Sequence, residues 1–246
     1  MNAPLHLAIG IFDGVHRGHQ YILQGALKAV KQWGGRVGVL TFHPHPKRVL
    51  GLPNAPQMIY PIQQRYWLLR RFGCQYVFVK KFSNDWSRFS PDRFFVFLKR
   101  FFPQLKTLHV GEDFHFGYQR QGDVNTLREL CRADRSVQAC IYPHLMENGH
   151  RICSTQIRDM LQSASIKIVN QLLGMPYHCI GFIKESIFYH HCELKIKGGT
   201  YHCKLKNKLG LQEVVVEVKD GIIYLFTQPN ACFLRRACLL EFQSEM

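Results

Sequence analysis

The chain changes its hydrophobic pattern once, near residue 178, and this change limits the folds open to it. Before it, short apolar runs such as residues 5–12 and 36–42 alternate with amphipathic segments of helical spacing such as residues 19–33. Continuous apolar runs are typical of strands covered on both faces, and their alternation with helices is typical of a parallel sheet. We therefore expect an α/β fold with a doubly wound parallel sheet up to about residue 177.

After residue 178, apolar and polar residues alternate, in segments such as 200–207 and 212–228. This period of two predicts half-buried strands, and Gly198-Gly199 and Asp220-Gly221 stand where hairpin turns are expected. No segment here has helical spacing. We therefore predict two domains, residues 1–177 and a small antiparallel, β-barrel-like domain over residues 178–246.

Turn and capping residues set the limits of the predicted elements in the first domain. Ser90 followed by Pro91 is typical of a helix start, and glycines close two other helices. The segment 43–57 is so rich in proline that we expect only loop there. The predicted strands are residues 5–12, 36–42, 75–82, 106–111 and 137–142, and the predicted helices are residues 19–33, 62–73, 91–102 and 123–133.

The charge of the chain indicates an anionic ligand without identifying it. There are 32 Lys and Arg residues against 17 Asp and Glu, a net charge of +15. Such a surface fits a small anion, a nucleic acid or an acidic partner. Because no long run of Lys or Arg is present, a basic surface that only keeps the protein soluble explains the charge about as well as a nucleic-acid site does. We therefore do not expect nucleic acid as a partner.

The cysteines and the apolar segments predict a cytoplasmic protein. The nine cysteines are an odd number and form no CxxC pair, which favours reduced, mostly buried thiols over a disulfide framework. The first residues lack a basic region and a long apolar run, so we expect no signal peptide. No stretch approaches the roughly 18 apolar residues of a membrane span, so we expect no membrane partner.

A pair of histidines follows the first predicted strand, in the stretch GIFDGVHRGHQ at residues 10–20. Ligands of parallel sheets bind beyond the carboxyl ends of the strands, and the next helix offers free N–H groups there. Gly14 and Gly18 let the backbone approach a phosphate, and His16 and His19 can stabilise charge on a phosphoryl group during displacement. A structural histidine pair is the alternative, which the surrounding strand, glycines and helix make the weaker interpretation.

Two further stretches carry polar residues near predicted element ends. In RICSTQIRDML, Ser154 and Thr155 can cap a helix over residues 156–161, and Arg158 in its first turn would oppose the helix dipole unless an anion binds there. In VGEDFHFG, residues 110–117, aromatic residues beside carboxylates suit a planar ring ligand. Core aromatics with a solvated acidic loop explain the second stretch equally well.

Together these motifs resemble the bacterial FAD synthetases, which are usually bifunctional riboflavin kinase/FMN adenylyltransferases. The resemblance covers about residues 5–177. Its HxGH motif, residues 16–19, is shared with other nucleotidylyltransferases. The PHP loop at residues 44–46 and GEDFHFG at residues 111–117 are more specific to proteins that bind flavin. It implies a Rossmann-like nucleotidylyltransferase fold and AMP transfer from ATP to FMN. The matching segments are residues 8–20, 40–50, 110–117, 122–124, 151–161 and 172–177.

The resemblance also implies the nucleotide-binding residues. His16 and His19 would stabilise the triphosphate and the departing pyrophosphate, and Arg158 would act with them in catalysis. The β- and γ-phosphates of ATP would be held by Ser154, Thr155 and Arg158. The nucleotide loop would be shaped by Gly10, Phe12, Asp13 and Gly18.

The flavin and metal assignments follow from the same resemblance. Mg²⁺ would bridge the phosphates of ATP, and we identify no carboxylate cage that would hold it as a protein metal site. The substrates implied are ATP and FMN. The flavin end would be formed by Phe42, His43, Pro44, Pro46, Asp113 and Phe116, with Phe116 against the ring system.

The sequence departs from the family pattern in two places. Where the family has Ser-Ser-Thr-x-Ile-Arg, often with Arg at x, this chain has Cys153 in place of the first Ser and Gln156 at x. We expect weakened phosphate contacts and a working site. In residues 178–246 the Pro-Thr-x-Asn motif of the riboflavin kinase domain is absent, so we expect a degenerate kinase-like domain without phosphorylation activity.

Three rival functions stay open at this point. The chain could transfer AMP to another phosphate acceptor, or it could retain riboflavin kinase activity through residues that we do not recognise. It could also be a non-catalytic protein whose basic surface binds RNA or an acidic partner, with a steep salt dependence and no turnover.

Overall fold

The computed structural model describes residues 3–163, 165–234 and 236–246. By its internal contacts the chain divides into two compact units, and each is treated by itself below. The first comprises residues 1–56 and 65–151, and the second comprises residues 57–64 and 152–246. This division reflects how the chain packs and does not define functional domains. The functional domains predicted above, 1–177 and 178–246, remain a prediction.

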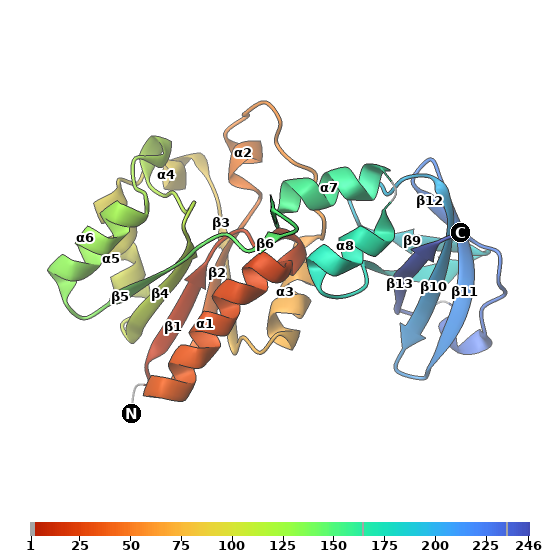
Figure 1. The fold of residues 1–246 in the computed structure, drawn as a ribbon, viewed down its shortest axis with the longest axis horizontal. Helices are drawn as coiled ribbons and strands as arrows, with labels where there is room; N and C mark the ends of the chain where they lie inside the picture. The colour runs from red at the N-terminus through yellow and green to blue at the C-terminus, as the bar shows by residue number, and fades with distance from the viewer. Residues whose placement is uncertain (1–2, 164, 235) are drawn as a thin grey trace. The chain divides into compact units, whose positions relative to one another are not determined.

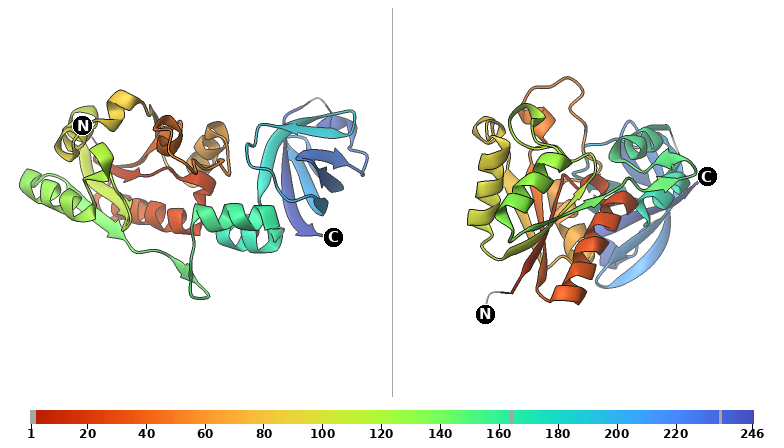
Figure 2. Two further views of the ribbon diagram at one scale, coloured as in Figure 1. Left: turned by 90° about the horizontal axis from the view of Figure 1, so that it is seen from above. Right: turned by 60° about the vertical axis from the view of Figure 1, so that its left-hand side comes forward.

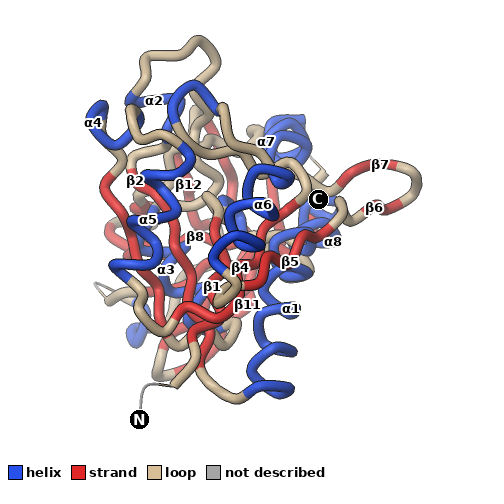
Figure 3. Tube along the Cα trace, turned by 90° about the vertical axis from the view of Figure 1, so that its left-hand side faces the viewer, coloured by secondary structure: helices blue, strands red, loops and turns tan. Residues whose placement is uncertain are grey.

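A five-stranded parallel sheet forms the centre of the first unit, in the order β3-β2-β1-β4-β5. The strands run side by side in Figure 3, and every neighbouring pair is parallel. This arrangement confirms the predicted doubly wound sheet. The strands are β1 (Leu5–Ile9), β2 (Arg36–His43), β3 (Tyr76–Lys81), β4 (Leu105–Gly111) and β5 (Gln138–Tyr142).

Helices cover both faces of this sheet. In Figure 1, α1 (Arg17–Trp33) and α3 (Ile62–Arg71) lie on one side, and α5 (Pro91–Phe101) and α6 (Val124–Asp134) on the other. The helices begin where side chains cap free N–H groups: Ser90 accepts from the N–H of Arg93, and Asp123 accepts from that of Thr126. A two-residue pair of strands, β6 (Met146–Glu147) and β7 (His150–Arg151), completes the unit with the short helix α4 (Asn84–Ser87).

The prediction of loop throughout residues 43–57 is wrong in one place. A short helix, α2 (Pro46–Val49), forms there. The Nδ1 atom of His45 accepts a hydrogen bond from the N–H of Lys47, and Pro46 occupies the first helical position, where the missing N–H costs nothing. Proline therefore starts a helix here, although the same residue type usually ends one.

The face of the sheet under α5 and α6 carries an apolar core. Leu7 of β1 and Leu108 of β4 are fully buried there, and Phe94 and Leu98 of α5 pack onto them. Each buried leucine or phenylalanine contributes about 1.5–3 kcal/mol of transfer free energy. This aromatic-rich layer holds β1 and β4 side by side, so the loops that follow them start from a rigid frame.

The opposite face carries a chain of buried hydrogen bonds between strands. His6 Nδ1 lies 2.8 Å from Thr107 Oγ1, which lies 2.7 Å from His109 Nε2, and His109 Nδ1 lies 2.8 Å from the hydroxyl of Tyr142. These bonds tie β1, β4 and β5 together, and Tyr142 packs against Gly25 of α1, where a Cβ atom would collide with its ring. Burial, and then the nearby His6, lower the pKa of His109 to about 4.

A closed antiparallel barrel forms the main part of the second unit, in the order β10-β11-β12-β9-β8-β13, and Figure 2 shows its strands curving around one interior. It confirms the predicted barrel-like domain. The apolar residues of the alternating segments fill the interior of the barrel, and Tyr201, Leu205, Val216 and Leu240 are all buried. The strands are β8 (His178–Lys184), β9 (Ile187–His190), β10 (Gly199–Asn207), β11 (Gly210–Lys219), β12 (Ile222–Leu225) and β13 (Cys238–Glu245).

Two helices, α7 (Ser154–Ser163) and α8 (Ile166–Leu173), precede the barrel, and α8 packs against β13. The predicted start of the first helix at Gln156 is wrong, because α7 begins at Ser154. The N–H of Ile157 donates to the carbonyl oxygen of Cys153 at 3.2 Å, so Cys153 occupies the capping position. In the part of the chain that the structure describes, no helix combines the length and the apolar character needed to cross a bilayer.

Replacing His109 by Gln is expected to flatten the pH dependence of stability. The histidine is neutral in the folded protein down to a pKa of about 4, whereas its ordinary pKa is 6.5. Its contribution is therefore fully present above pH 6.5 and is lost as the pH falls toward 4, with a slope of at most about 1.4 kcal/mol per pH unit. Glutamine keeps a donor and an acceptor and does not titrate.

Urea unfolding of both proteins at a series of pH values measures this difference. We expect the wild-type free energy of unfolding to decline more steeply than that of His109→Gln between pH 6.5 and about 4. Parallel curves would contradict the assignment of a neutral, buried His109. His202→Gln, at an exposed position of the barrel, is the control and is expected to leave the wild-type slope unchanged.

Candidate functional site

The loop that follows β1 has an unusual backbone. Phe12, Gly14 and Val15 have φ angles of 52°, 84° and 47°. The left-handed region costs energy for any residue with a Cβ atom and most for a β-branched one such as Val15. Phe12 and Val15 are nevertheless buried, at 1% exposure each, so packing holds the loop in this form. Strain of this kind is typical of functional loops.

The two histidines lie together at the start of α1. His16 is the residue that caps the helix, and its Nδ1 accepts from the N–H of His19 at 3.3 Å. Their rings stack with centroids 3.6 Å apart and an angle of 21° between the planes. The spacing of three residues across a helix start brings both rings to one side. Within the described residues, the Nδ1 atom of His19 is buried and has no hydrogen-bond partner.

The histidine pair is surrounded by positive charge. Burial lowers the pKa of His19 well below its ordinary value, and the neighbouring His16, Arg65 and Arg151 lower it further. His19 is therefore neutral at physiological pH in the free protein. Two imidazoles, two guanidinium groups and the free N–H groups at the start of α1 together make a site for an anion.

Arg65 is a site residue that the sequence analysis missed. It comes from α3, is 1% exposed, and its Nη1 donates to the carbonyl oxygen of Ile11 and, at 3.5 Å, to Thr41 Oγ1. An arginine is rarely buried without a specific partner. Its position on the buried stripe of α3, next to Leu68 and Leu69, is a signal in the sequence that could have identified it.

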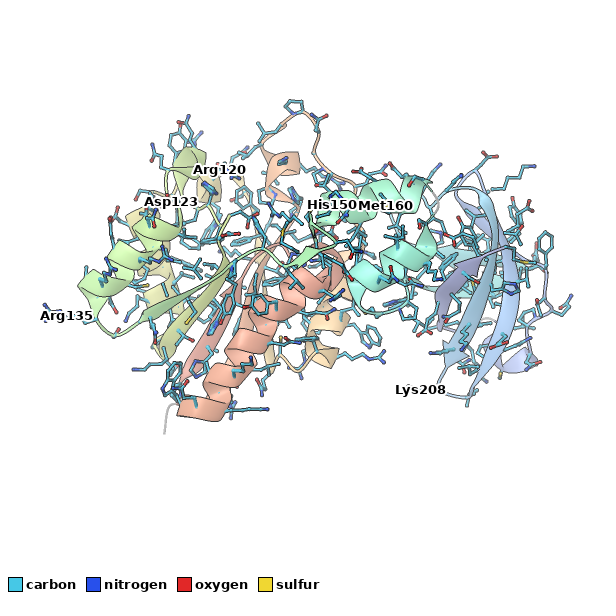
Figure 4. All side chains as sticks on the ribbon, viewed as in Figure 1. Arg120, Asp123, Arg135, His150, Met160 and Lys208 are labelled. Carbon is cyan, nitrogen blue, oxygen red and sulfur yellow. The ribbon has the colours of Figure 1, made fainter. Side chains whose placement is uncertain are left out.

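The β6–β7 hairpin supplies a second residue that the sequence analysis assigned no role. Arg151 forms an ion pair with Asp113, which follows β4, and Glu147 forms one with Arg17 at the start of α1. Figure 4 shows the side chains of this hairpin, with His150 labelled. The hairpin thus joins the loop after β4 to the first turn of α1. Both ion pairs are partly exposed, so each contributes little to stability by itself.

The predicted flavin residues come from the ends of β2 and β4. Phe42 and Phe116 are 8% and 6% exposed and belong to the apolar core. Phe116 packs against Phe94 and Phe114, with ring centroids 5.2 and 5.4 Å away. The half-buried His43, Pro44 and Pro46 lie where β2 leads into α2, and Asp113 is exposed apart from its ion pair. Their contact with a flavin remains a prediction.

Ser154, Thr155 and Arg158 belong to the second unit and are described within it. Ser154 and Thr155 are the first two residues of α7, so Arg158 lies in its second turn and the prediction of a first-turn position is wrong. The Nε atom of Arg158 donates to the carbonyl oxygen of Gln57 at 2.8 Å. Their phosphate contacts remain a prediction.

The remaining predicted residues complete the loop after β1. The N–H of Gly10 donates to the carbonyl oxygen of Leu40 at 3.2 Å, which ties the end of β1 to β2. Asp13 is buried at 2% exposure, and Gly18 lies in the first turn of α1 beside the histidines. The ring of Phe12 contacts His19 edge to face, with centroids 5.2 Å apart. These six predicted residues, Gly10, Phe12, Asp13, His16, Gly18 and His19, thus lie between the end of β1 and the first turn of α1.

The position of this loop in the sheet is typical of nucleotide sites. In the order β3-β2-β1-β4-β5, the chain reverses direction across the sheet between β1 and β4. Ligands of open α/β sheets bind at such a switch point, beyond the carboxyl ends of the strands. The histidine loop, residues 10–19, follows β1, and the Asp113 loop, residues 112–117, follows β4. Both loops therefore border this position.

Known proteins resemble this chain in sequence. A bifunctional riboflavin kinase/FMN adenylyltransferase of Bacillus subtilis is 31% identical over 180 residues, which are 72% of this chain and 55% of that protein. A protein named FAD synthetase from Listeria monocytogenes is 30% identical over 73% of this chain and 72% of its own length. The match thus spans little more than half the length of the Bacillus subtilis protein.

A solved structure resembles the whole chain in fold. A crystal structure from Streptococcus pneumoniae, titled as a macrolide-efflux protein, has a TM-score of 0.85, covers 100% of this chain and 86% of its own, and is 20% identical. That identity supports the fold alone.

A family profile matches the segment with the two histidines and the loop after β4, and it ends within the motif at residues 151–161. The profile of the FAD synthetases matches residues 1–156, well over half of the chain. Those residues include the strained loop after β1, the stacked histidines and the Asp113 loop. By this match and by the identity to its relatives, the chain belongs to the FAD synthetase family.

Proposed function

We propose that this protein transfers the AMP group of ATP to FMN and releases pyrophosphate, forming FAD. The observation that carries the proposal is the stacked pair of His16 and His19 beside the free N–H groups of α1, with their centroids 3.6 Å apart. The names of the relatives support the same reaction. A buried Nδ1 atom of His19 without a partner suits a ligand with an acceptor oxygen.

In the proposed reaction a phosphate oxygen of FMN attacks the α-phosphorus of ATP. The bond from that phosphorus to the oxygen bridging to the β-phosphate breaks, and pyrophosphate leaves with the electron pair. Since a phosphate oxygen is already a competent nucleophile, the protein needs only to align the groups and stabilise charge. His16 and His19 donate hydrogen bonds where that charge develops, and an approaching triphosphate raises the pKa of His19.

The other residues position the two substrates. Arg65 and Arg151 add positive potential at the histidine loop, and Ser154, Thr155 and Arg158 hold the terminal phosphates of ATP. The flavin meets the residues at the ends of β2 and β4, with Asp113 as a polar contact. Phe116 packs in the apolar core. In the proposed complex it therefore supports the loop after β4 and also faces the flavin ring.

Mg²⁺ fits this chemistry as a companion of ATP. In the described part of the chain, no group of three carboxylate or imidazole ligands converges on the histidine loop. Phosphate oxygens of ATP would supply most of its ligands, as is common for this ion. When bound, Mg²⁺ would neutralise negative charge on the phosphates, and the residues named above would position ATP and FMN.

We also propose that the protein lacks riboflavin kinase activity and works in the cytoplasm. The barrel sequence has no Pro-Thr pair after residue 183, where the resemblance leads us to expect one. All nine cysteines are free, which suits a reducing compartment.

The first experiment compares two flavin substrates. Purified protein with MgATP is given FMN or riboflavin, and the products are separated by chromatography. We expect FAD from FMN and no product from riboflavin. FMN or FAD formed from riboflavin would contradict the loss of the kinase. No product from either would contradict the proposed transfer and favour another acceptor or a binding protein.

Replacing His19 by Ala is expected to lower kcat by about 10²-fold or more, since the imidazole acts mainly on charge in the transition state. Thermal melting should stay near the wild-type value, because in the described residues the buried Nδ1 atom of His19 has no hydrogen bond to lose. His202→Ala, at an exposed position of the barrel, is the matched control and should keep full activity. Near-normal FAD formation by His19→Ala would exclude the role assigned to the pair.

Replacing Cys153 by Ser is expected to restore a strong cap to α7. A serine hydroxyl accepts a free N–H group of the first turn, which a thiol does poorly, and this stabilises the protein by about 0.5–1 kcal/mol. The better-ordered helix start should also lower KM for ATP. Urea unfolding and steady-state kinetics measure both effects. Cys140→Ser, another half-buried cysteine, is the control, and an equal gain there would contradict the capping argument.

A further inference from the structure

Two cysteines and a histidine that have no role in the proposed function meet in the second unit. Cys179 lies in β8, His190 is the last residue of β9, and Cys192 follows two residues later. The β8–β9 ladder pairs Gly181 with His190, so its register, continued by two residues, places Cys179 opposite Cys192. A cross-strand pair of this kind has its side chains on one face.

The distances between these side chains fit one shared ion. One ligand atom from each residue lies within 4.8 Å of the others, and the two sulfur atoms are 3.4 Å apart. Tetrahedral zinc with Zn–S bonds of about 2.3 Å separates its two sulfur ligands by about 3.8 Å. A disulfide would need about 2.05 Å. The observed separation is closer to that of two ligands of a metal.

The surroundings of the cluster hold its members in place. Cys179 is 2% exposed, and its Sγ donates to the hydroxyl of Tyr177 at 3.9 Å. Nδ1 of His190 accepts from the N–H of Cys192 at 3.1 Å, so the turn orients the imidazole beside the second sulfur. His190 and Cys192 are half-buried, so the cluster is closed on the side of Cys179 and reachable from the other.

We propose that Cys179, His190 and Cys192 bind Zn²⁺ and that the ion fastens the end of the β8–β9 hairpin. Two thiolates and an imidazole select a thiophilic transition metal over Mg²⁺ or Ca²⁺. Three protein ligands leave the fourth tetrahedral position to water. The ion stabilises the barrel because it binds the folded hairpin and not the separated strands. The proposal is independent of AMP transfer.

The test uses the whole 246-residue chain, reduced, treated with a chelator and then given Zn²⁺, Co²⁺ or Cu⁺ alone. We expect one Zn²⁺ per chain by mass spectrometry of the metal content and a raised Tm. Co²⁺ should give the near-ultraviolet charge-transfer band of cobalt–thiolate bonds and the visible bands of a tetrahedral ion. This spectrum of the wild-type protein decides the question even if a variant fails to fold.

Variants locate the site. Cys192→Ser and His190→Ala should each weaken Zn²⁺ binding by at least about tenfold and reduce the cobalt–thiolate band, since each removes one ligand. Cys232→Ser is the matched control, a half-buried cysteine of the same barrel outside the cluster, and should bind like the wild type.

Three results would overturn the proposal. The first is a cobalt spectrum without a thiolate band. The second is Zn²⁺ binding that survives both variants. The third is a Cys179–Cys192 disulfide, found by mass spectrometry of peptides from the non-reduced protein, together with no metal uptake after reduction. Binding of Cu⁺ with no uptake of Zn²⁺ would overturn the choice of ion.

Discussion

The central position of β1 is the constraint on which the candidate site depends. This strand is bonded on both edges, to β2 and to β4, and covered on both faces, so all five of its residues are buried. Its carboxyl end lies at the switch point of the sheet, and the chain must turn there at once into α1. The turn succeeds only with positive φ angles at Phe12, Gly14 and Val15. The core beneath the sheet therefore supports the strain in the loop.

Charge is the second organising element of the first unit. A buried guanidinium from α3 and an exposed one from the β6–β7 hairpin both raise the positive potential at His19. Arg65 is fixed by carbonyl and hydroxyl oxygens, whereas Arg151 is paired with Asp113 at the surface. The two arginines come from segments far apart in the chain. The fold places both close enough to His19 to lower the pKa of its imidazole. Positive potential concentrated at one point of the surface favours the binding of an anion there.

Local patterns in the sequence were enough to predict the parallel sheet, the change to an antiparallel barrel and the histidine loop. Each depends on spacing within a few residues, such as the three-residue interval between His16 and His19. The roles of Arg65 and Arg151 depend on contacts across many residues, which local spacing does not encode. The start of α7 was misplaced because Cys153 caps the helix through its carbonyl oxygen, a role open to any residue type. The short helix α2 was missed because proline is permitted at a helix start as well as in loops.

The low pKa of His19 has a consequence for how the site responds to its ligand. In the free protein the imidazole of His19 is neutral, because burial opposes its protonation. The neighbouring His16, Arg65 and Arg151 lower its pKa further. Under the proposed function, a bound polyphosphate is expected to offset that opposition and to favour the imidazolium. Ligand binding is then coupled to proton uptake from the solvent, and the heat of binding includes the ionisation heat of the buffer.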